Sequence, residues 1–429
     1  MAPIRLAIVG CGGMGHRHLY GLAELQAAGW QEFDLVAACD PVRDNAESLV
    51  RQAAERFGSR PAVVADLDQL PALGVQAVDV TTTPRSHHTI AVDALARGFH
   101  ALVEKPLGLT VRACNRIRMA AASSGQVLSV AENYRRDPIN RLAKALIDAG
   151  AIGEPRLLIQ HSIGGGDQML ISVWRHQKDQ SGVLLDVGVH YADMMEYLLG
   201  PIETVYAQTR LHEPIRKNPA AQGGTARTNP AGVYGRWQKE MPAEFQATAE
   251  DAVYATLTFA SGAAGQYVED HAGHGASVWL REIHGSAGSM TLPEDRSGGS
   301  IHLHPKGQGE LDQGALLDLV PNFRLDPVTA RLFGDERLTS YAFPFAETDR
   351  KLLAIEYAEF AQVIRGQNQI EVDAEQGTRA VAASYTLLES GAAGRPVAVA
   401  EVLDEAIDAY QRAINESLGL IRALSKSEM

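Results

Sequence analysis

Glycines near the N-terminus have the type and spacing of a phosphate-binding turn. Gly10, Gly12 and Gly15 follow an apolar stretch and are spaced G-x-G-x-x-G. Such glycines permit a tight turn, let a pyrophosphate approach the backbone and allow the next helix to pack closely on a sheet. Free N–H groups at the start of that helix would attract the anion. The pattern predicts a dinucleotide site, with a purely structural glycine turn as the alternative.

An acidic residue follows at the end of a second apolar stretch. Asp40 closes the run LVAACDP. At this position of a dinucleotide-binding unit, a carboxylate accepts hydrogen bonds from the adenosine ribose of NAD and repels a 2′-phosphate. NADP is therefore disfavoured, although the nearby Arg43 could offset part of the repulsion. The alternative is an aspartate that only shapes the turn before Pro41.

A lysine stands at the end of another apolar stretch. Glu104, Lys105 and Pro106 close the run HALVEKP. Ligands bind at the carboxyl ends of the strands in open α/β sheets, which is where this lysine would lie. A lysine in a surface loop is an equally good interpretation of these residues alone.

The third group of polar residues is Asp186, His190 and Asp193, in a stretch that has the composition of a helix. If residues 184–199 are helical, the three side chains share one face. An imidazole one turn from a carboxylate can act as a general acid or base near neutral pH. The alternative is a buried histidine that is bonded to an aspartate for stability.

The elements that must position these residues change in character along the chain. Up to about residue 130, apolar runs without alternation are separated by helical segments, which is typical of a doubly wound parallel sheet. Later segments alternate apolar and polar residues, which predicts an antiparallel sheet with one open face. We therefore expect an α/β domain over 1–133 and an α+β domain over 134–429.

Three segments of the second domain need separate mention. The stretch 212–248 is rich in Pro, Gly and Asn and is predicted to be a long insertion between strands, of a length that is often functional. A second loop-rich stretch covers 293–347. Helical periodicity returns in 351–366 and 374–394, and the tail 401–424 is predicted to form one more amphipathic helix.

Composition excludes several classes of protein. The chain has 429 residues, of which 45% are hydrophobic, and a formal net charge of −13, which argues against a nucleic-acid partner. No apolar run approaches the roughly 18 residues of a membrane span, and the N-terminus has the pattern of a strand and not of a secretory signal. We therefore expect no membrane partner and a cytoplasmic location.

Neither the cysteines nor the remaining histidines form a metal-ligand pattern. Cys11, Cys39 and Cys114 show neither a disulfide framework nor metal-type spacing. The pairs His271/His274 and His302/His304 have no carboxylate or cysteine cluster to complete a site. We predict no metal.

The motifs together resemble the glucose–fructose oxidoreductase / inositol dehydrogenase family, also called Gfo/Idh/MocA. The resemblance implies an N-terminal Rossmann domain, a C-terminal domain with an open antiparallel sheet, and a helix near 351–366 that packs back toward the Rossmann domain. It also implies hydride transfer between NAD or NADP and a secondary alcohol or carbonyl of a sugar or cyclitol. The segments that carry it include AIVGCGGMGHRH, TTPRSHHTIAVDALARGFHALVEKP, AENYRRDPINRLAKALIDAGAIGEP and SGVLLDVGVHYADMMEYLLG.

The resemblance also implies roles for individual residues. His190 would accept a proton, and Lys105 and Asp186 would complete the catalytic set. Residues that border NAD would be Gly10, Gly12, Gly13, Met14, Gly15, Asp40, Thr83, Pro84, His88, Glu104, Lys105 and Asn133. Substrate contacts would come from Lys105, Tyr134, Trp174, Arg175, Asp186 and His190. The chain departs from the family in having Ser181, Gly182 and Val183 where three glycines are common, and in the length of 212–248.

The sequence thus favours an NAD-dependent oxidoreductase that acts on a sugar, cyclitol or glycoside. Two alternatives stay open: an enzyme that oxidises a glycoside transiently in order to cleave it or eliminate from it, and a non-catalytic regulator that binds NAD or sugar. A small sugar or polyol is the expected partner. The stretch 252–260 places Val253, Ala255, Leu257 and Phe259 on one side and Tyr254 on the other. The resemblance implies pairing through the open face of such a sheet, as a homodimer or homotetramer.

Overall fold

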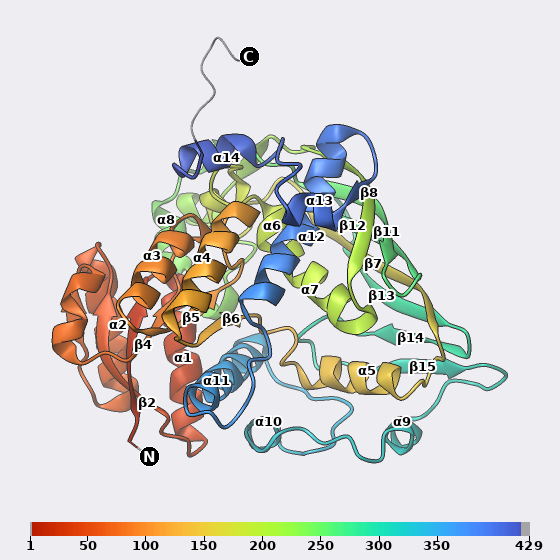
Figure 1. The fold of residues 1–429 in the computed structure, drawn as a ribbon, viewed down its shortest axis with the longest axis horizontal. Coiled ribbons are helices and arrows are strands. Elements are labelled where there is room, and N and C mark those ends of the chain that lie inside the picture. Colours follow the sequence, from red (N-terminus) through yellow and green to blue (C-terminus); the bar gives the residue numbers. More distant parts are fainter. Residues whose placement is uncertain (1, 422–429) are drawn as a thin grey trace, which may run out of the picture.

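The N-terminal domain is built on one sheet of six parallel strands (Figure 1). The computed structural model describes residues 2–421. The strand order is β3-β2-β1-β4-β5-β6, which confirms the doubly wound fold predicted from the apolar runs. The strands are β1 (Ile4–Val9), β2 (Phe33–Cys39), β3 (Ala62–Val64), β4 (Ala77–Val80), β5 (His100–Glu104) and β6 (Leu128–Ala131).

Helices cover both faces of this sheet, which explains why its strands are apolar without alternation. In β1, every residue except Arg5 is buried. The chain leaves β1 in one direction for β2 and β3 and returns to the other side for β4, so right-handed crossovers place the first two helices and the last two on opposite faces. They are α1 (Gly13–Ala27), α2 (Arg43–Phe57), α3 (Pro84–Ala96) and α4 (Val111–Ser124).

The C-terminal domain contains a sheet of eight strands in the order β15-β14-β13-β7-β12-β11-β8-β16. The pair β7 and β12 is parallel, and the other neighbours are antiparallel, as the alternating segments predicted. The strands are β7 (Pro155–Gly165), β8 (Ile202–Arg210), β11 (Ala252–Phe259), β12 (Ala264–Gly273), β13 (Val278–Gly285), β14 (Gly288–Leu292), β15 (His302–Pro305) and β16 (Val397–Ala398).

One face of this sheet is covered by helices and the other is open. In β11, Val253, Ala255, Leu257 and Phe259 are buried, whereas Tyr254 is exposed, as the alternation predicted. The long helix α12 packs against β8, α4 and α7 and so covers the inner face. The longer helices of this domain are α5 (Pro138–Asp148), α7 (Gly188–Leu199), α11 (Phe345–Ile364) and α12 (Ala374–Ala393), and short ones include α6 (Val183–Asp186), α9 (Gln313–Leu319) and α10 (Pro327–Phe333).

The prediction of one helix over 401–424 was wrong. The structure has two short helices, α13 (Val399–Leu403) and α14 (Arg412–Ser417), and residues 422–424 lie outside the described residues. Between the two helices, Glu405 has a φ of 58°, which ends the helical path. Side chains of this segment form hydrogen bonds with the start of α4. Gln411 Oε1 accepts from the backbone N–H of Val111 at 2.9 Å, and Asn415 Oδ1 accepts from Thr110 Oγ1 at 2.7 Å.

The predicted insertion 212–248 folds into a small unit of its own. Its two strands, β9 (Ile215–Lys217) and β10 (Glu244–Gln246), pair with each other and with no strand of the two large sheets, and they enclose α8 (Gly235–Glu240). Figure 1 shows α8 beside the N-terminal domain. There Trp237 contacts the His16 ring of α1, at 5.7 Å between ring centroids.

The helices α1 and α11 join the N-terminal sheet to the rest of the chain. They cross so closely at Gly21 that a Cβ atom there would lie 2.4 Å from the Cβ of Leu353 and 3.1 Å from its carbonyl carbon. Glycine is therefore required for the contact itself. One helical turn before this crossing in each helix, Arg17 and Asp349 form a buried ion pair.

We expect Gly21→Val to destabilise the protein by about 1 to 3 kcal/mol, since the added side chain must push the two helices apart. The measurement is the thermal unfolding midpoint. The matched control is Gly309→Val, at an exposed glycine where nothing lies within 4 Å of an added Cβ. Equal midpoints for the two variants would contradict the packing argument.

Candidate active site

Two cavities adjoin at the carboxyl ends of the parallel strands. The nucleotide cavity, about 590 Å³, is bordered by the glycine turn and Asp40. The central cavity, about 570 Å³, is bordered by Lys105, Asp186 and His190. Met14 and Arg175 line both, so the two cavities form one continuous site. The sequence placed Asp40 and Lys105 at strand ends and Asp186 and His190 on a helix, and all four border this site.

The glycine turn has the geometry that a pyrophosphate requires. Gly10 has a φ of +99°, and a Cβ on Gly15 would lie 2.3 Å from the carbonyl oxygen of Gly10, so α1 packs tightly on the end of β1. Gly12 precedes the helix, no side chain caps it, and nothing lies within 4 Å of a Cβ built there. The first-turn N–H groups of α1 have no intrahelical acceptor, so they are available to an anion in this open space.

Asp40 borders the nucleotide cavity and also shapes the turn. Its Oδ2 accepts from the backbone N–H of Cys11 at 2.8 Å, and its Oδ1 accepts from that of Val42 at 2.8 Å. Each carboxylate oxygen keeps a second lone pair for a ribose hydroxyl. Arg43 is exposed, pairs with Glu47 at 2.7 Å and does not line the cavity, so it leaves the charge of Asp40 unopposed there.

The other residues expected at the cofactor are distributed over both cavities. Thr83 lines the nucleotide cavity, and Glu104 and Asn133 line the central one. Pro84 and His88 line neither cavity, since the face of α3 that borders the nucleotide cavity carries other residues. These are Thr89, Ile90 and Asp93.

Two cations hold Asp186 at the junction of the two domains. Lys105 Nζ donates to the backbone oxygen of Asp186 at 2.7 Å and lies 3.3 Å from its Oδ1. Arg175 Nε donates to Asp186 Oδ2 at 2.7 Å. Burial alone would raise the pKa of this carboxyl, but Arg175 and Lys105 hold it well below its ordinary value. Asp186 is therefore a permanent negative charge.

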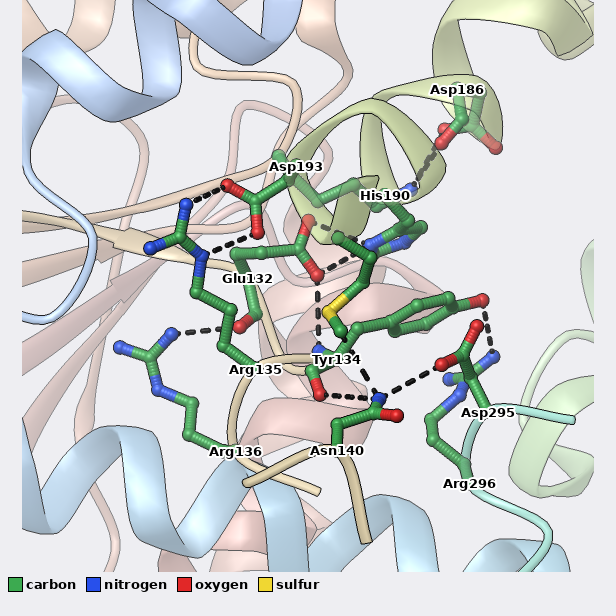
Figure 2. Close-up of polar contacts among 12 residues, drawn as sticks. Glu132, Tyr134, Arg135, Arg136, Asn140, Asp186, His190, Asp193, Asp295 and Arg296 are labelled. Carbon is green, nitrogen blue, oxygen red and sulfur yellow. Dashed lines mark hydrogen bonds and ion pairs between the residues drawn. The ribbon is translucent and has the colours of Figure 1, made fainter. Parts of the chain in front are cut away.

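The segment predicted as one helix over 184–199 is divided at Val187 into α6 and α7, although Val187 itself keeps helical dihedrals, with φ of −95° and ψ of −45°. The polar residues of this segment have different partners. Asp193 does not face the cavity, because Arg135 holds both of its carboxylate oxygens at 2.6 Å (Figure 2). Asp186 and His190 both line the central cavity, but the carboxylate that bonds the imidazole is a different one.

That carboxylate is Glu132, which the sequence analysis missed. Both of its oxygens lie 2.7 Å from His190 Nδ1, and the ring of Tyr134 stacks on the imidazole at 4.1 Å between centroids (Figure 2). Burial lowers the pKa of His190 well below its ordinary value and raises that of Glu132 to about 7. Glu132 follows β6 directly, so its place at a strand end was the signal that could have revealed it.

Arg296 is a second residue that the sequence analysis missed. Its Nη2 donates to Tyr134 Oη at 3.2 Å, and its guanidinium lies over the rings of Tyr134 and Phe345. The backbone of Arg296 has a φ of 64°, a conformation that residues other than glycine rarely adopt. It lines the central cavity from the loop-rich stretch 293–347, where no sequence pattern marked it.

The two aromatic residues expected at the substrate differ in position. Tyr134 lines the central cavity, as a substrate contact would. Trp174 lines only the nucleotide cavity, where the guanidinium of Arg175 lies 4.1 Å above its ring.

Metal ligands and membrane spans are both absent from residues 2–421. No three His, Cys, Asp or Glu side chains in this range cluster as metal ligands. Cys11, Cys39 and Cys114 are buried thiols. Nor does any helix in the described range have the length and apolar character to cross a bilayer.

Comparison with known families identifies the chain. A model described as "Oxidoreductase family, NAD-binding Rossmann fold" matches residues 4–132, and one described as "Oxidoreductase family, C-terminal alpha/beta domain" matches residues 144–399. The chain belongs to the Gfo/Idh/MocA oxidoreductase family. The resemblance seen in the motifs is thereby confirmed, and so is NAD as the cofactor of the N-terminal domain.

Relatives in this family differ in how much of the chain they cover. Levoglucosan dehydrogenase of Pseudarthrobacter phenanthrenivorans is 30% identical over 303 residues, 69% of this chain and 75% of the relative. A D-apiose dehydrogenase of Rhizobium rhizogenes is 25% identical over 52% of this chain and 60% of its own length. Among solved structures, levoglucosan dehydrogenase in complex with NADH has a TM-score of 0.72 at 23% identity and covers 93% of this chain and 99% of its own.

The buried Glu132 predicts a pH-dependent stability. Between the ordinary pKa of 4.5 and the folded value of about 7, the folded chain keeps a proton that the unfolded chain releases, so stability falls as pH rises through this window. Glu132→Gln cannot titrate and avoids this loss, which is about 3 kcal/mol by the linkage relation. As pH rises from 5 to 8, the unfolding midpoint of the unaltered protein should therefore fall relative to that of Glu132→Gln.

The control for this prediction is Glu240→Gln, at an exposed carboxylate outside both cavities. Its midpoints should follow those of the unaltered protein at every pH. If the Glu132→Gln curve also runs parallel to it, Glu132 does not hold an extra proton in the folded state.

Proposed function

We propose that this oxidoreductase transfers hydride between NAD and a secondary alcohol or the matching carbonyl of a sugar or cyclitol. The observation that carries the proposal is the meeting of Lys105 and His190 in one cavity that adjoins the nucleotide cavity, with Glu132 bonded to the imidazole. The relatives named as levoglucosan and D-apiose dehydrogenases support a sugar-like substrate.

His190 is the proposed proton acceptor. Its Nδ1 faces Glu132, so a proton on Nδ1 donates to that carboxylate and leaves the lone pair on Nε2 for the substrate hydroxyl. Burial lowers the pKa of the imidazole, so it is neutral and able to accept a proton at neutral pH. The stacked Tyr134 ring limits how far the imidazole can rotate.

Lys105 is proposed to stabilise charge on the reacting oxygen. Its ammonium is held by the backbone oxygen and carboxylate of Asp186, which leaves a third N–H for the substrate. A positioned cation opposes the negative charge that develops when the hydroxyl loses its proton. Asp186 is charged at all working pH values, so it holds the ammonium in place and takes no part in proton transfer.

The residues around the nucleotide cavity fit NAD. The open turn at Gly12 and the first-turn N–H groups of α1 would hold the pyrophosphate, and Asp40 would bond the adenosine ribose. When bound, NAD supplies the hydride acceptor. The charge of Asp40 supports NAD over NADP as the cofactor.

Polar side chains in the central cavity support a substrate with several hydroxyl groups. Hydroxyls need donors and acceptors in place of water, and this cavity offers both kinds away from the catalytic residues. They include Gln168, Arg227, Thr228, Asp270 and His271.

We propose further that the enzyme is a homodimer or homotetramer in the cytoplasm, where NAD turns over. The outer face of the eight-stranded sheet supports pairing, since Tyr206 of β8 is 44% exposed and Tyr254 of β11 is 38% exposed on that face. Two copies related by a two-fold axis would cover these rings symmetrically.

His190→Ala should lower turnover by about 10² to 10⁴ with a sugar or inositol substrate, because the alcohol loses its proton acceptor. NADH affinity should change little, since the imidazole lines the central cavity only. Initial rates of NADH formation over a panel of sugars and inositols measure turnover, and fluorescence titration measures NADH affinity. His302→Ala, at an exposed histidine, is the control. Near-full activity of His190→Ala would refute the assigned role.

For the oligomer, we expect light scattering after size exclusion to give twice or four times the chain mass of 46.1 kDa. Tyr254→Glu should shift the equilibrium toward the monomer, because it places a charge in the proposed interface. Glu240→Gln should leave the mass unchanged. A monomer at micromolar concentration of the unaltered protein would refute the pairing.

A further inference from the structure

The insertion 212–248 reaches the nucleotide cavity although it belongs to the C-terminal part of the chain. Tyr234, Trp237 and Met241 line that cavity together with the glycine turn and Asp40. The insertion therefore provides a wall of the site that the parallel sheet and its loops do not supply.

Tyr234 lies directly on the start of α1. A Cβ atom built on Gly13 would lie 2.2 Å from Tyr234 Cε1 and 2.8 Å from Cζ, the atom that carries the hydroxyl. The glycine at this position is thus required by the ring as well as by an approaching anion. The hydroxyl end of Tyr234 consequently lies beside the first-turn N–H groups of α1.

The hydroxyl of Tyr234 lacks a partner that its burial calls for. The side chain is 7% exposed, and within residues 2–421 its Oη makes no hydrogen bond. A buried hydroxyl without a partner costs free energy, so a water, an ion or a ligand is expected to supply the missing bond. The α1 amides and this phenol are all donors, so an oxyanion would satisfy them together.

The insertion is anchored to the N-terminal domain at a second point. Trp237 meets the His16 ring edge-on, and its Nε1 donates to Asn45 Oδ1 at 3.3 Å. Arg236 Nη2 donates to the same oxygen at 2.6 Å. Since His16 belongs to α1 and Asn45 to α2, helix α8 contacts two of the helices beside the nucleotide cavity.

The insertion is also ordered internally, so its contacts are those of a built element. The buried Gln238 donates from Nε2 to the backbone oxygens of Ile171 and Thr228, at 3.0 and 2.7 Å. Asn218, also buried, donates to the backbone oxygen of Gln238 at 2.8 Å. These bonds fix α8 against the loop that carries Trp174 and Arg175.

We propose that the insertion completes the cofactor site: Tyr234 donates a hydrogen bond to the pyrophosphate of NAD, and Trp237 and Met241 cover the adenosine part opposite Asp40. The inference rests on NAD as the cofactor of the proposed function. Release of the cofactor then requires α8 to leave His16 and Asn45, so the insertion sets the rate of cofactor exchange.

The test uses the full chain with NADH alone, without a sugar. Tyr234→Phe removes one oxygen and keeps the ring on Gly13, and we expect it to weaken NADH binding about tenfold or more. Trp237→Ala should speed NADH release about tenfold or more, as measured by stopped-flow displacement with excess NAD. The control is Lys239→Ala, on the same helix but outside the nucleotide cavity.

A second pair of ligands locates the contact on the cofactor. ADP-ribose contains the pyrophosphate and adenosine does not. Tyr234→Phe should therefore weaken the binding of ADP-ribose and leave the binding of adenosine unchanged. Equal NADH affinity for Tyr234→Phe and the unaltered protein overturns the proposal, as does an equal loss for both ligands. Neither result touches the proposed function, which fails instead if the unaltered protein forms no NADH with any sugar or inositol of the panel.

Circular dichroism and unfolding midpoints of the variants show whether each is folded. Should Trp237→Ala be unfolded, Trp237→Phe keeps the ring contact with His16 but loses the bond to Asn45, and faster NADH release is again expected. Unchanged release in a folded Trp237 variant overturns the part of the proposal that concerns exchange.

Discussion

The contact of Lys105 with Asp186 is the interaction around which both domains are arranged. Lys105 comes from the end of β5 in the parallel sheet, and Asp186 from the end of α6 in the other domain. A buried ion pair is costly unless its remaining bonds are satisfied, and here Arg175 and the backbone oxygen of Asp186 satisfy them. The site therefore forms only where the two domains meet.

A second buried network supports the strand that carries Lys105. His18 of α1 bonds Asp79 through Nδ1 and Glu104 through Nε2, both at 3.0 Å. Burial alone would lower the pKa of His18, but Asp79 and Glu104 raise it well above its ordinary value. Tyr357 of α11 donates to the same Asp79 oxygen at 2.5 Å. One cation between two carboxylates thus ties α1, β4, β5 and α11 together behind the site.

Sequence patterns predicted those parts of the protein that local periodicity determines. Apolar runs predicted the parallel sheet, and the residues that follow its strands, Gly12, Asp40 and Lys105, line the two cavities at its carboxyl edge. The partner of His190 could not be found in this way, because Glu132 is 58 residues distant in the chain and meets the imidazole only through the packing of the two domains. Arg296 and the docking of 212–248 depend on tertiary contacts of irregular segments, and the split of 401–424 depends on bonds to Thr110 and Val111.

Asp186 and Glu132, the two carboxylates nearest to the proposed proton acceptor and cation, are distinguished by what surrounds them. Asp186 lies between Arg175 and Lys105, which keep it ionised, so it can only hold and orient those cations. Glu132 is held by burial at a pKa of about 7, so it can gain or lose a proton near neutral pH. Environments that push two pKa values apart assign different roles to like groups. In the proposed mechanism His190 therefore accepts the substrate proton beside a carboxylate that can share it, while the charge that stabilises the reacting oxygen stays fixed on Lys105.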